Sequence, residues 1–275
     1  MPVFESHDLR TYYELEGPES APVLVLSNSL GCDLAMWQPQ ADRFRQHFRL
    51  LRYDTRGHGQ SSATLSPYTI AQLSGDLLAL LDHLQIGEAC FCGLSMGGLI
   101  GMWLGANAPG RFRKLVLCNT AAKIGTQEGW DTRMVAVRNN GLRPLVPAAL
   151  ARWFTPEFRA QHPEIMEATG SMLEHTDPEG YAGCCAAIRD ANMRGLLTRV
   201  RTPTLVVSGK HDPVTTPADG QELANRISGA RYAELEAAHL SNCEVSKAFT
   251  RVVLEFLCDS VANRKEVKNG RSRAL

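Results

Sequence analysis

The fold is decided by the stretch Gly93-Leu94-Ser95-Met96-Gly97, which has the pattern G-x-S-x-G. The apolar run 89–93 is typical of a buried strand, and the small, apolar residues 96–108 predict a helix packed against a sheet. A serine between such a strand and helix stands on a sharp turn, and small neighbours let other chain segments pass close to it. The stretch therefore predicts a strand–turn–helix unit that lifts the Ser95 hydroxyl into a cleft.

Short apolar runs recur along the chain and alternate with helical patterns. Runs typical of buried strands cover residues 23–26, 48–54, 114–118, 204–209 and 231–235. Apolar side chains at three- and four-residue spacings indicate helices at 70–84 and 245–257, and Thr216-Pro217 is typical of a helix start. This alternation predicts an α/β fold with a mostly parallel central sheet and helices on both faces.

The alternation stops between residues 122 and 194, where the pattern is helical and shows no clear strand. An insertion between two strand signals predicts a helical cap over the carboxyl edge of the sheet. We therefore expect a core formed by residues 1–121 and 195–260 and a cap formed by residues 122–194. The polar, basic residues 261–275 have no periodicity and are predicted to form a flexible tail.

Composition and charge exclude several classes of protein. The chain has 275 residues, with 29 Lys and Arg balanced by 29 Asp and Glu, whereas a nucleic-acid binder would show a basic excess. The first residues lack the basic start and apolar core of a signal peptide, and no run approaches the roughly 18 apolar residues of a membrane span. We expect a soluble, cytoplasmic protein that binds neither nucleic acid nor membrane.

A serine is a weak nucleophile at neutral pH and needs a neighbouring base. His239 lies in a loop after the last predicted strand and before the last predicted helix, where it could overhang the edge of the sheet. His58 and His211 also lie in loops. A turn-stabilising role suits His58 better, and the side chain of His211 should diverge from that of its neighbour Asp212. The sequence therefore favours His239 as the base.

The base in turn needs a carboxylate to orient it. Asp212 comes three residues after Gly209, where the strand 204–209 ends. The order Ser95, Asp212, His239 along the chain is the order expected for a serine on this kind of turn. Asp54 and Asp190 are the alternatives for the acid.

Acyl chemistry also needs two N–H donors aimed at the oxygen that becomes negatively charged. One donor is expected from the residue after the nucleophile, Met96. The other should come from the loop after the first core strand, residues 27–31, where Leu30 is the candidate. Both donors are backbone groups, so the side chains at these positions can vary.

Together these residues resemble the α/β-hydrolase family over about residues 10–258. The matching features are the D-x-R-G-x-G-x-S turn at 54–61, the turn at Ser95, the G-x-x-D step at 209–212, and His239. The resemblance implies a Ser95–Asp212–His239 triad and an oxyanion hole formed by Leu30 and Met96. It also implies that no metal or organic cofactor is required.

One departure from the family is informative, because Asn28-Ser29 stands where most relatives have His-Gly. The segments 26–37 and 93–101 closely resemble the 3-oxoadipate enol-lactonases of aromatic catabolism. This resemblance implies hydrolysis of a small anionic lactone to 3-oxoadipate through an acyl-enzyme. Carboxylesterases, cofactor-free haloperoxidase-like enzymes and C–C bond hydrolases share the frame and stay open as alternatives. A non-catalytic small-molecule receptor is the alternative outside enzymes.

Such a lactone carries a free carboxylate, and the first half of the predicted cap is basic. Its cations are Lys123, Arg133, Arg138, Arg143 and Arg152. We expect Arg133 or Arg138 to contact the substrate carboxylate, with Trp130 and Trp153 as apolar walls. The alternative is that the basic and acidic halves are solvated helix faces of opposite charge.

Overall fold

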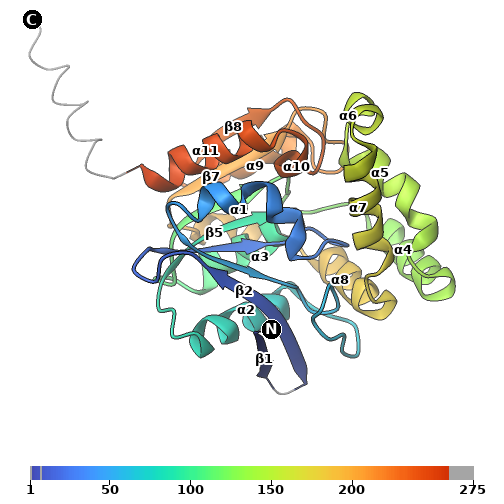
Figure 1. Ribbon diagram of the computed structural model, residues 1–275, viewed down its shortest axis with the longest axis horizontal. Helices are drawn as coiled ribbons and strands as arrows, with labels where there is room; N and C mark the ends of the chain where they lie inside the picture. Colours follow the sequence, from blue (N-terminus) through green and yellow to red (C-terminus); the bar gives the residue numbers. More distant parts are fainter. Residues whose placement is uncertain (1, 7, 260–275) are drawn as a thin grey trace, which may run out of the picture.

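The computed structural model describes residues 2–6 and 8–259. In this part of the chain one eight-stranded sheet has the order β1-β2-β4-β3-β5-β6-β7-β8 (Figure 1). Its strands are β1 (Val3–Ser6), β2 (Leu9–Glu16), β3 (Val23–Ser27), β4 (Arg49–Tyr53), β5 (Ala89–Leu94), β6 (Phe112–Cys118), β7 (Thr204–Gly209) and β8 (Arg231–Leu235). From β4 to β8 every neighbouring pair is parallel, which confirms the predicted mostly parallel sheet.

Strands β1 and β2 were not predicted from the sequence. They pair antiparallel with each other, and β2 pairs antiparallel with β4. Glu14 and Glu16 interrupt the apolar pattern of β2, and half of its residues are only partly buried. Arg52 of β4 pairs with both charges, because its Nη2 lies 2.5 Å from Glu14 Oε2 and 2.8 Å from Glu16 Oε2. A half-exposed edge strand paired through ions lacks the continuous apolar run by which the other strands are recognised.

Helices cover both faces of the sheet. In the core these helices are α1 (Gln38–Phe44), α2 (Ile70–His83), α3 (Met96–Asn107), α9 (Pro217–Arg226), α10 (Ser241–Glu244) and α11 (Ser246–Cys258). Helix α1 packs against α11, whereas α2 packs against α3 and α9 packs against β7 and β8. The predicted start of α9 is confirmed: the Thr216 hydroxyl accepts a hydrogen bond from the Asp219 N–H and forms a capping box with that residue.

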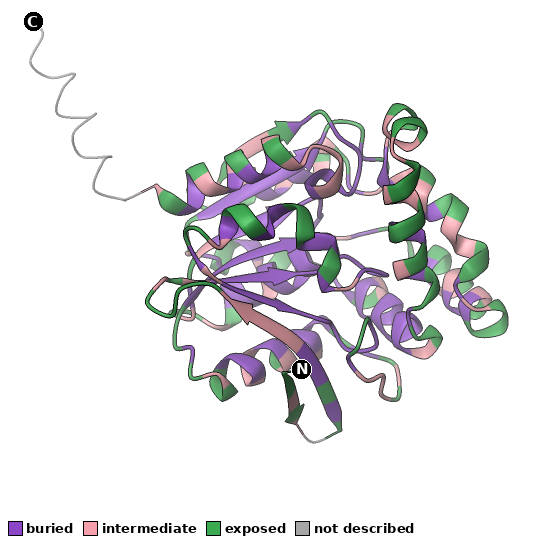
Figure 2. Ribbon diagram, in the orientation of Figure 1, coloured by how far each residue is buried: buried purple, intermediate pink, exposed green. Residues whose placement is uncertain are grey.

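Further helices lie between β6 and β7, in the interval predicted to form the cap. They are α4 (Gln127–Asn140), α5 (Val146–Trp153), α6 (Pro156–Gln161), α7 (Pro163–Glu174) and α8 (Pro178–Asp190). Figure 1 shows them at one end of the sheet, and Figure 2 shows that the outer sides of α6 and α7 are exposed. Helix α8 rests on the core, since a Cβ on Gly180 would lie 2.4 Å from Gly57 Cα.

Two further predictions concern the C-terminal tail and membrane-spanning helices. The predicted flexible tail, residues 261–275, lies outside the described residues. Within the described residues no helix combines the length and the apolar character that a membrane span requires.

Candidate active site

The turn that carries Ser95 joins β5 to α3. Ser95 has φ 58° and ψ −109°, a backbone conformation that L-residues rarely adopt. Glycines on each side make the turn possible. A Cβ on Gly93 would lie 2.3 Å from Gly97 O, and a Cβ on Gly97 would lie 2.2 Å from Ser27 O. The G-x-S-x-G pattern therefore reflects two close backbone approaches, and it leaves the serine at the start of a helix.

Asp212 and His239 meet at the carboxyl edge of the sheet. Both side chains are buried, and His239 Nδ1 lies 2.8 Å from Asp212 Oδ2. Asp212 Oδ1 also accepts hydrogen bonds from the N–H groups of Val214 and Thr215, at 2.8 and 3.0 Å. Burial alone would raise the pKa of Asp212, but the charge of His239 and the donors around the carboxylate outweigh burial and lower it. The carboxylate is thus held in its ionised form beside the imidazole.

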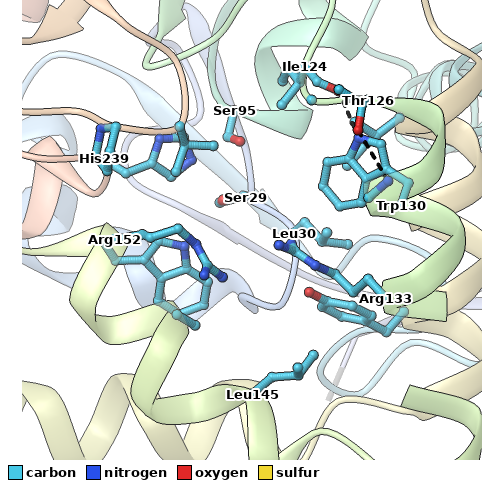
Figure 3. Close-up of a pocket in the computed structure, with 18 residues that line it drawn as sticks. Ser29, Leu30, Ser95, Ile124, Thr126, Trp130, Arg133, Leu145, Arg152 and His239 are labelled. Carbon is cyan, nitrogen blue, oxygen red and sulfur yellow. Dashed lines mark hydrogen bonds between the residues drawn. The ribbon is translucent and has the colours of Figure 1, made fainter. Parts of the chain in front are cut away.

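Ser95 and His239 line one cavity of about 350 Å³. Figure 3 shows the Ser95 hydroxyl and the His239 ring on the wall of the same space. Because Nδ1 is bonded to Asp212, the other ring nitrogen of His239 is the one available to the cavity. Within residues 2–6 and 8–259 no hydrogen bond joins Ser95 Oγ to His239. In enzymes such a bond often tightens only when substrate binds.

The two predicted oxyanion donors lie on segments that touch each other. Gly97 N donates to Asn28 O at 3.1 Å, which ties the first turn of α3 to the loop after β3. In the described part of the chain neither the Leu30 N–H nor the Met96 N–H donates to another protein group. Leu30 lines the cavity, and Met96 directly follows Ser95. These two N–H groups are therefore available for an oxygen in the cavity.

His58 supports the loop that carries Leu30. Its Nε2 accepts a hydrogen bond from Gly31 N at 2.9 Å, and its Nδ1 lies 3.2 Å from Arg56 O. Because Gly31 N is a donor and Arg56 O an acceptor, the ring is neutral with its proton on Nδ1. Burial lowers the pKa of His58 to about 4, which is consistent with a neutral ring. The sequence suggested a turn-stabilising role for His58, but it did not show that His58 binds the loop that carries Leu30.

Helices α4 and α5, from the interval predicted to form the cap, supply the opposite wall of the cavity. Trp130, Arg133, Arg152 and Trp153 all line it. The guanidinium of Arg133 lies 4.7 Å from the centre of the Trp130 ring. Burial lowers the pKa of Arg152, and the neighbouring charge of Arg133 lowers it further. Figure 3 shows both guanidinium groups in the space across from Ser95.

Neither of these two arginines has an acidic partner in the described part of the chain. The ion pairs found there involve other arginines, such as Arg138 and Arg189. Two neighbouring guanidinium groups with no carboxylate between them repel each other, and a bound anion would relieve that repulsion. The cap wall is therefore suited to a ligand that carries a carboxylate.

The structure does not bring Arg138 to this wall. Its guanidinium makes two hydrogen bonds of 2.9 Å to the Glu179 carboxylate and one of 2.8 Å to Ser66 Oγ, outside the cavity. Arg152, which the sequence placed only in the basic set, takes the position instead. The available signal was its place in the last turn of a helix, directly before Trp153.

The alternative acids and base lie away from the cavity lining. Asp54 is buried and accepts a hydrogen bond from Leu34 N at 2.8 Å, and burial raises its pKa to about 7. Asp190 is paired with Arg189, and His211 is half exposed beside Glu236. None of the three lines the cavity that contains Ser95.

Comparison with known proteins shows what the chain is similar to. Residues 22–244 match the family described as the alpha/beta hydrolase fold. The chain is 46% identical to 3-oxoadipate enol-lactonase 2 of Acinetobacter baylyi, over 92% of this chain and 97% of that protein. Among solved structures it is 48% identical to the enol-lactonase from Burkholderia xenovorans LB400, with a TM-score of 0.93 over 94% of this chain and 100% of that one.

A hydrolase from Pseudomonas aeruginosa PA01 is similar as well, with 42% identity and a TM-score of 0.91 over 93% of this chain and 97% of that one. The predicted resemblance to the 3-oxoadipate enol-lactonases is confirmed by these relatives. With the family match over most of its length, the chain belongs to the alpha/beta hydrolase fold family.

Proposed function

We propose that this protein hydrolyses 3-oxoadipate enol-lactone to 3-oxoadipate, a step in the breakdown of protocatechuate or catechol, by a Ser–His–Asp triad through an acyl-enzyme. The observation that carries the proposal is the cavity itself. It has Ser95 and His239 on one side and two arginines without acidic partners on the other. The high identity to enol-lactonases supports the choice of substrate.

In the first half of the reaction Ser95 Oγ attacks the lactone carbonyl while His239 takes up its proton. Asp212 keeps the imidazole in the required tautomer and stabilises the imidazolium. The carbonyl oxygen becomes negative and is bound by the N–H groups of Leu30 and Met96. Loss of one such donor typically raises the barrier by about 3–4 kcal/mol.

Collapse of the tetrahedral intermediate breaks the ring C–O bond. The leaving group is an enolate, which is a better leaving group than an alkoxide and depends less on protonation by His239. It remains attached to the acyl-enzyme as part of the acyl chain. There its carbon takes up the proton that His239 removed from Ser95, so the enolate becomes a ketone, His239 is neutral again, and re-closure of the ring is unfavourable.

In the second half of the reaction water attacks the acyl-enzyme and His239 takes up the proton of that water. The oxyanion is bound by the same two N–H groups, and collapse returns the proton to Ser95 Oγ. The released product, 3-oxoadipate, carries the new carboxylate together with the one already present in the lactone. No group outside the chain takes part in these steps except water.

The carboxylate already present in the substrate is bound by the cap. Arg133 and Arg152 place two guanidinium groups across the cavity from Ser95. A planar guanidinium binds a carboxylate through two parallel hydrogen bonds, so this pair anchors the free end of the lactone. Trp130 and Trp153 line the same cavity and exclude water from the ring.

The test is hydrolysis of the enol-lactone, followed as the loss of its ultraviolet absorbance, by the wild type and by Ser95→Ala. We expect efficient turnover by the wild type and a loss of at least about a thousandfold in Ser95→Ala, because the nucleophile is removed. Ser171→Ala, an exposed serine on α7, is the matched control and should behave as the wild type.

A second substrate separates this reaction from those of other hydrolases. The neutral ester p-nitrophenyl acetate tests the triad without the substrate carboxylate. We expect kcat/KM for the lactone to exceed that for the ester by several orders of magnitude. Efficient ester hydrolysis with slow lactone hydrolysis would instead identify a carboxylesterase, and retention of both activities in Ser95→Ala would refute the triad.

A further inference from the structure

Asn119 follows β6 directly and is fully buried, and the mechanism above gives it no role. Its Nδ2 donates to Asp212 Oδ2 at 3.0 Å and to Ala238 O at 3.1 Å. Its Oδ1 accepts a hydrogen bond from Ser241 Oγ at 2.6 Å. One side chain thus contacts the loop of the acid and, on both sides of His239, the loop of the base.

The pattern of donors and acceptors around Asn119 suits an amide. Two acceptors, a carboxylate oxygen and a carbonyl oxygen, face Nδ2, while a hydroxyl donor faces Oδ1. An aspartate in this place would present a negatively charged oxygen to both acceptors. An apolar side chain would leave buried polar groups without a partner.

The backbone around Asn119 is arranged for the same contact. Asn119 has φ 44°, in the left-handed region that asparagine tolerates better than most residues, and its N–H donates to Val207 O at 2.8 Å. A Cβ on Gly209 would lie 2.9 Å from Asn119 Nδ2 and 2.3 Å from Ala238 O. The glycine that precedes Asp212 in the G-x-x-D step therefore makes room for the amide to pass between the two loops.

The shared acceptor links this contact to the reaction. Asp212 Oδ2 binds His239 Nδ1 at 2.8 Å and also accepts from Thr215 Oγ1 at 2.8 Å and from Asn119. Thr215 lies three residues from Asp212 and orients the carboxylate only within its own loop. Asn119 alone among these donors also binds the chain next to His239.

We propose that Asn119 is a positioning residue that fixes Asp212 relative to the loop of His239 and stabilises the carboxylate of Asp212. The proposal rests on the hydrolytic role of Ser95, Asp212 and His239 described above. It predicts that the chemistry of the side chain at position 119 changes the pH dependence of turnover as well as its rate.

Asn119→Asp is the sharpest variant because it keeps the shape of the side chain and changes its charge. At pH 8 the introduced carboxylate faces Asp212 Oδ2, and two like charges about 3 Å apart are strongly unfavourable. We expect kcat/KM for p-nitrophenyl acetate to fall at least about a hundredfold. At pH 5.5 the introduced carboxyl group is protonated and donates a hydrogen bond to Asp212. The ratio of variant to wild-type activity should therefore be at least tenfold higher at pH 5.5 than at pH 8.

Asn119→Ala provides a second measurement that adds no charge. It removes one donor from Asp212, and a carboxylate with fewer donors binds a neighbouring cation or proton more tightly. We expect kcat to fall about tenfold to a hundredfold with KM nearly unchanged. The acid limb of the pH profile of kcat should move up by about half a pH unit to one unit, as expected for one hydrogen bond.

The control for added charge is Asn140→Asp, an exposed asparagine at the end of α4 whose activity ratio to wild type should not vary with pH. Active sites are counted from the p-nitrophenol burst, so that a partly folded variant is compared per site. A flat ratio for Asn119→Asp together with an unshifted acid limb for Asn119→Ala would overturn the proposal. If the wild type hydrolyses the enol-lactone and Ser95→Ala abolishes turnover of both substrates, the proposed function stands whatever the Asn119 variants do.

Discussion

The two walls of the cavity differ in how their polar groups are partnered. Behind the core wall, on which His239 lies, the carboxylate of Asp212 is bound by His239, Thr215 and Asn119, all from the chain itself. On the cap wall Arg133 and Arg152 have no acidic partner in the described residues. A group that must keep one geometry during a reaction is held by the protein, whereas a group that recognises a charge is left for the ligand.

The two walls are nevertheless tied together beside His239. Leu240 N donates to Trp153 O at 3.0 Å. The carboxylate of Glu244 accepts from Ala238 N at 2.8 Å and from Thr155 N at 3.1 Å. The end of α5, which carries Arg152, is therefore hydrogen-bonded to the loop of the base. Movement of this end of α5 would therefore shift the loop that holds the imidazole of His239.

The largest effect is expected where the core wall is broken. Asp212→Asn places an amide where five donors converge, three on Oδ2 and two on Oδ1, so in either orientation its nitrogen faces other donors. The imidazole then adopts the wrong tautomer, and kcat should fall by about ten-thousandfold with little change in KM. Steady-state kinetics with the enol-lactone measure the loss. Asp190→Asn, outside the cavity, is the control, and a loss under tenfold in Asp212→Asn would show that another group orients His239.

A smaller effect, on stability, is expected at His58, which accepts a hydrogen bond from the loop that carries Leu30. The pKa of His58 is lowered to about 4 by burial, against about 6.5 in an unfolded chain. Between these values the unfolded state binds the proton and the folded state does not, so His58 destabilises the fold as pH falls from 6.5 to 4. The full effect is about 3 kcal/mol at pH 4.

His58→Gln isolates this contribution, because a glutamine oxygen can still accept the Gly31 N–H but does not titrate. Urea denaturation at pH 7, 5.5 and 4.5 gives the difference in unfolding free energy between wild type and variant. We expect that difference to favour the variant increasingly as pH falls. Burial raises the pKa of Asp54 to about 7, which acts in the opposite direction in both proteins and cancels in the difference. A difference that does not vary with pH would mean that His58 binds its proton as readily in the folded protein as in the unfolded chain.

The sequence predicted the core wall better than the cap wall, for physical reasons. Buried parallel strands require continuous apolar runs, and the members of a triad are expected after such strands in a set order, so Ser95, Asp212 and His239 could be proposed from the sequence. Asn119 could not, because a single asparagine after a strand is also typical of an ordinary turn. Its role depends on which loops lie beside it in space.

Helix geometry explains why Arg138 does not line the cavity together with Arg133. Arg133 and Arg138 are five positions apart on α4, and at about 100° per residue their side chains point roughly 140° apart. Both therefore cannot face one cavity. Trp130 and Arg133 are three residues apart and share a face, as their contact shows. The periodicity of α4 predicts that Arg133 and Arg138 lie on different sides of the helix. The sequence does not show which of those sides faces the cavity.

The smallest expected effect tests the cap wall. Arg133→Gln and Arg152→Gln each remove one charge-assisted contact with the substrate carboxylate, worth about 1.5–3 kcal/mol. KM for the enol-lactone should therefore rise about tenfold to a hundredfold in each variant, with kcat much less affected. For neutral p-nitrophenyl acetate KM should stay within about twofold of the wild type, because that ester has no carboxylate to bind.

Arg138→Gln is the matched control, since it removes the same charge from the same helix but outside the cavity. It should leave KM unchanged for both substrates. If Arg133→Gln and Arg152→Gln raise KM equally for the lactone and the neutral ester, the arginines shape the cavity but do not bind the substrate carboxylate. The double variant adds a further distinction: two arginines that bind one carboxylate are coupled, so their combined effect should differ from the sum of the single effects. Strict additivity would mean that the two cations act on different parts of the substrate. Only one of the two arginines would then bind the substrate carboxylate.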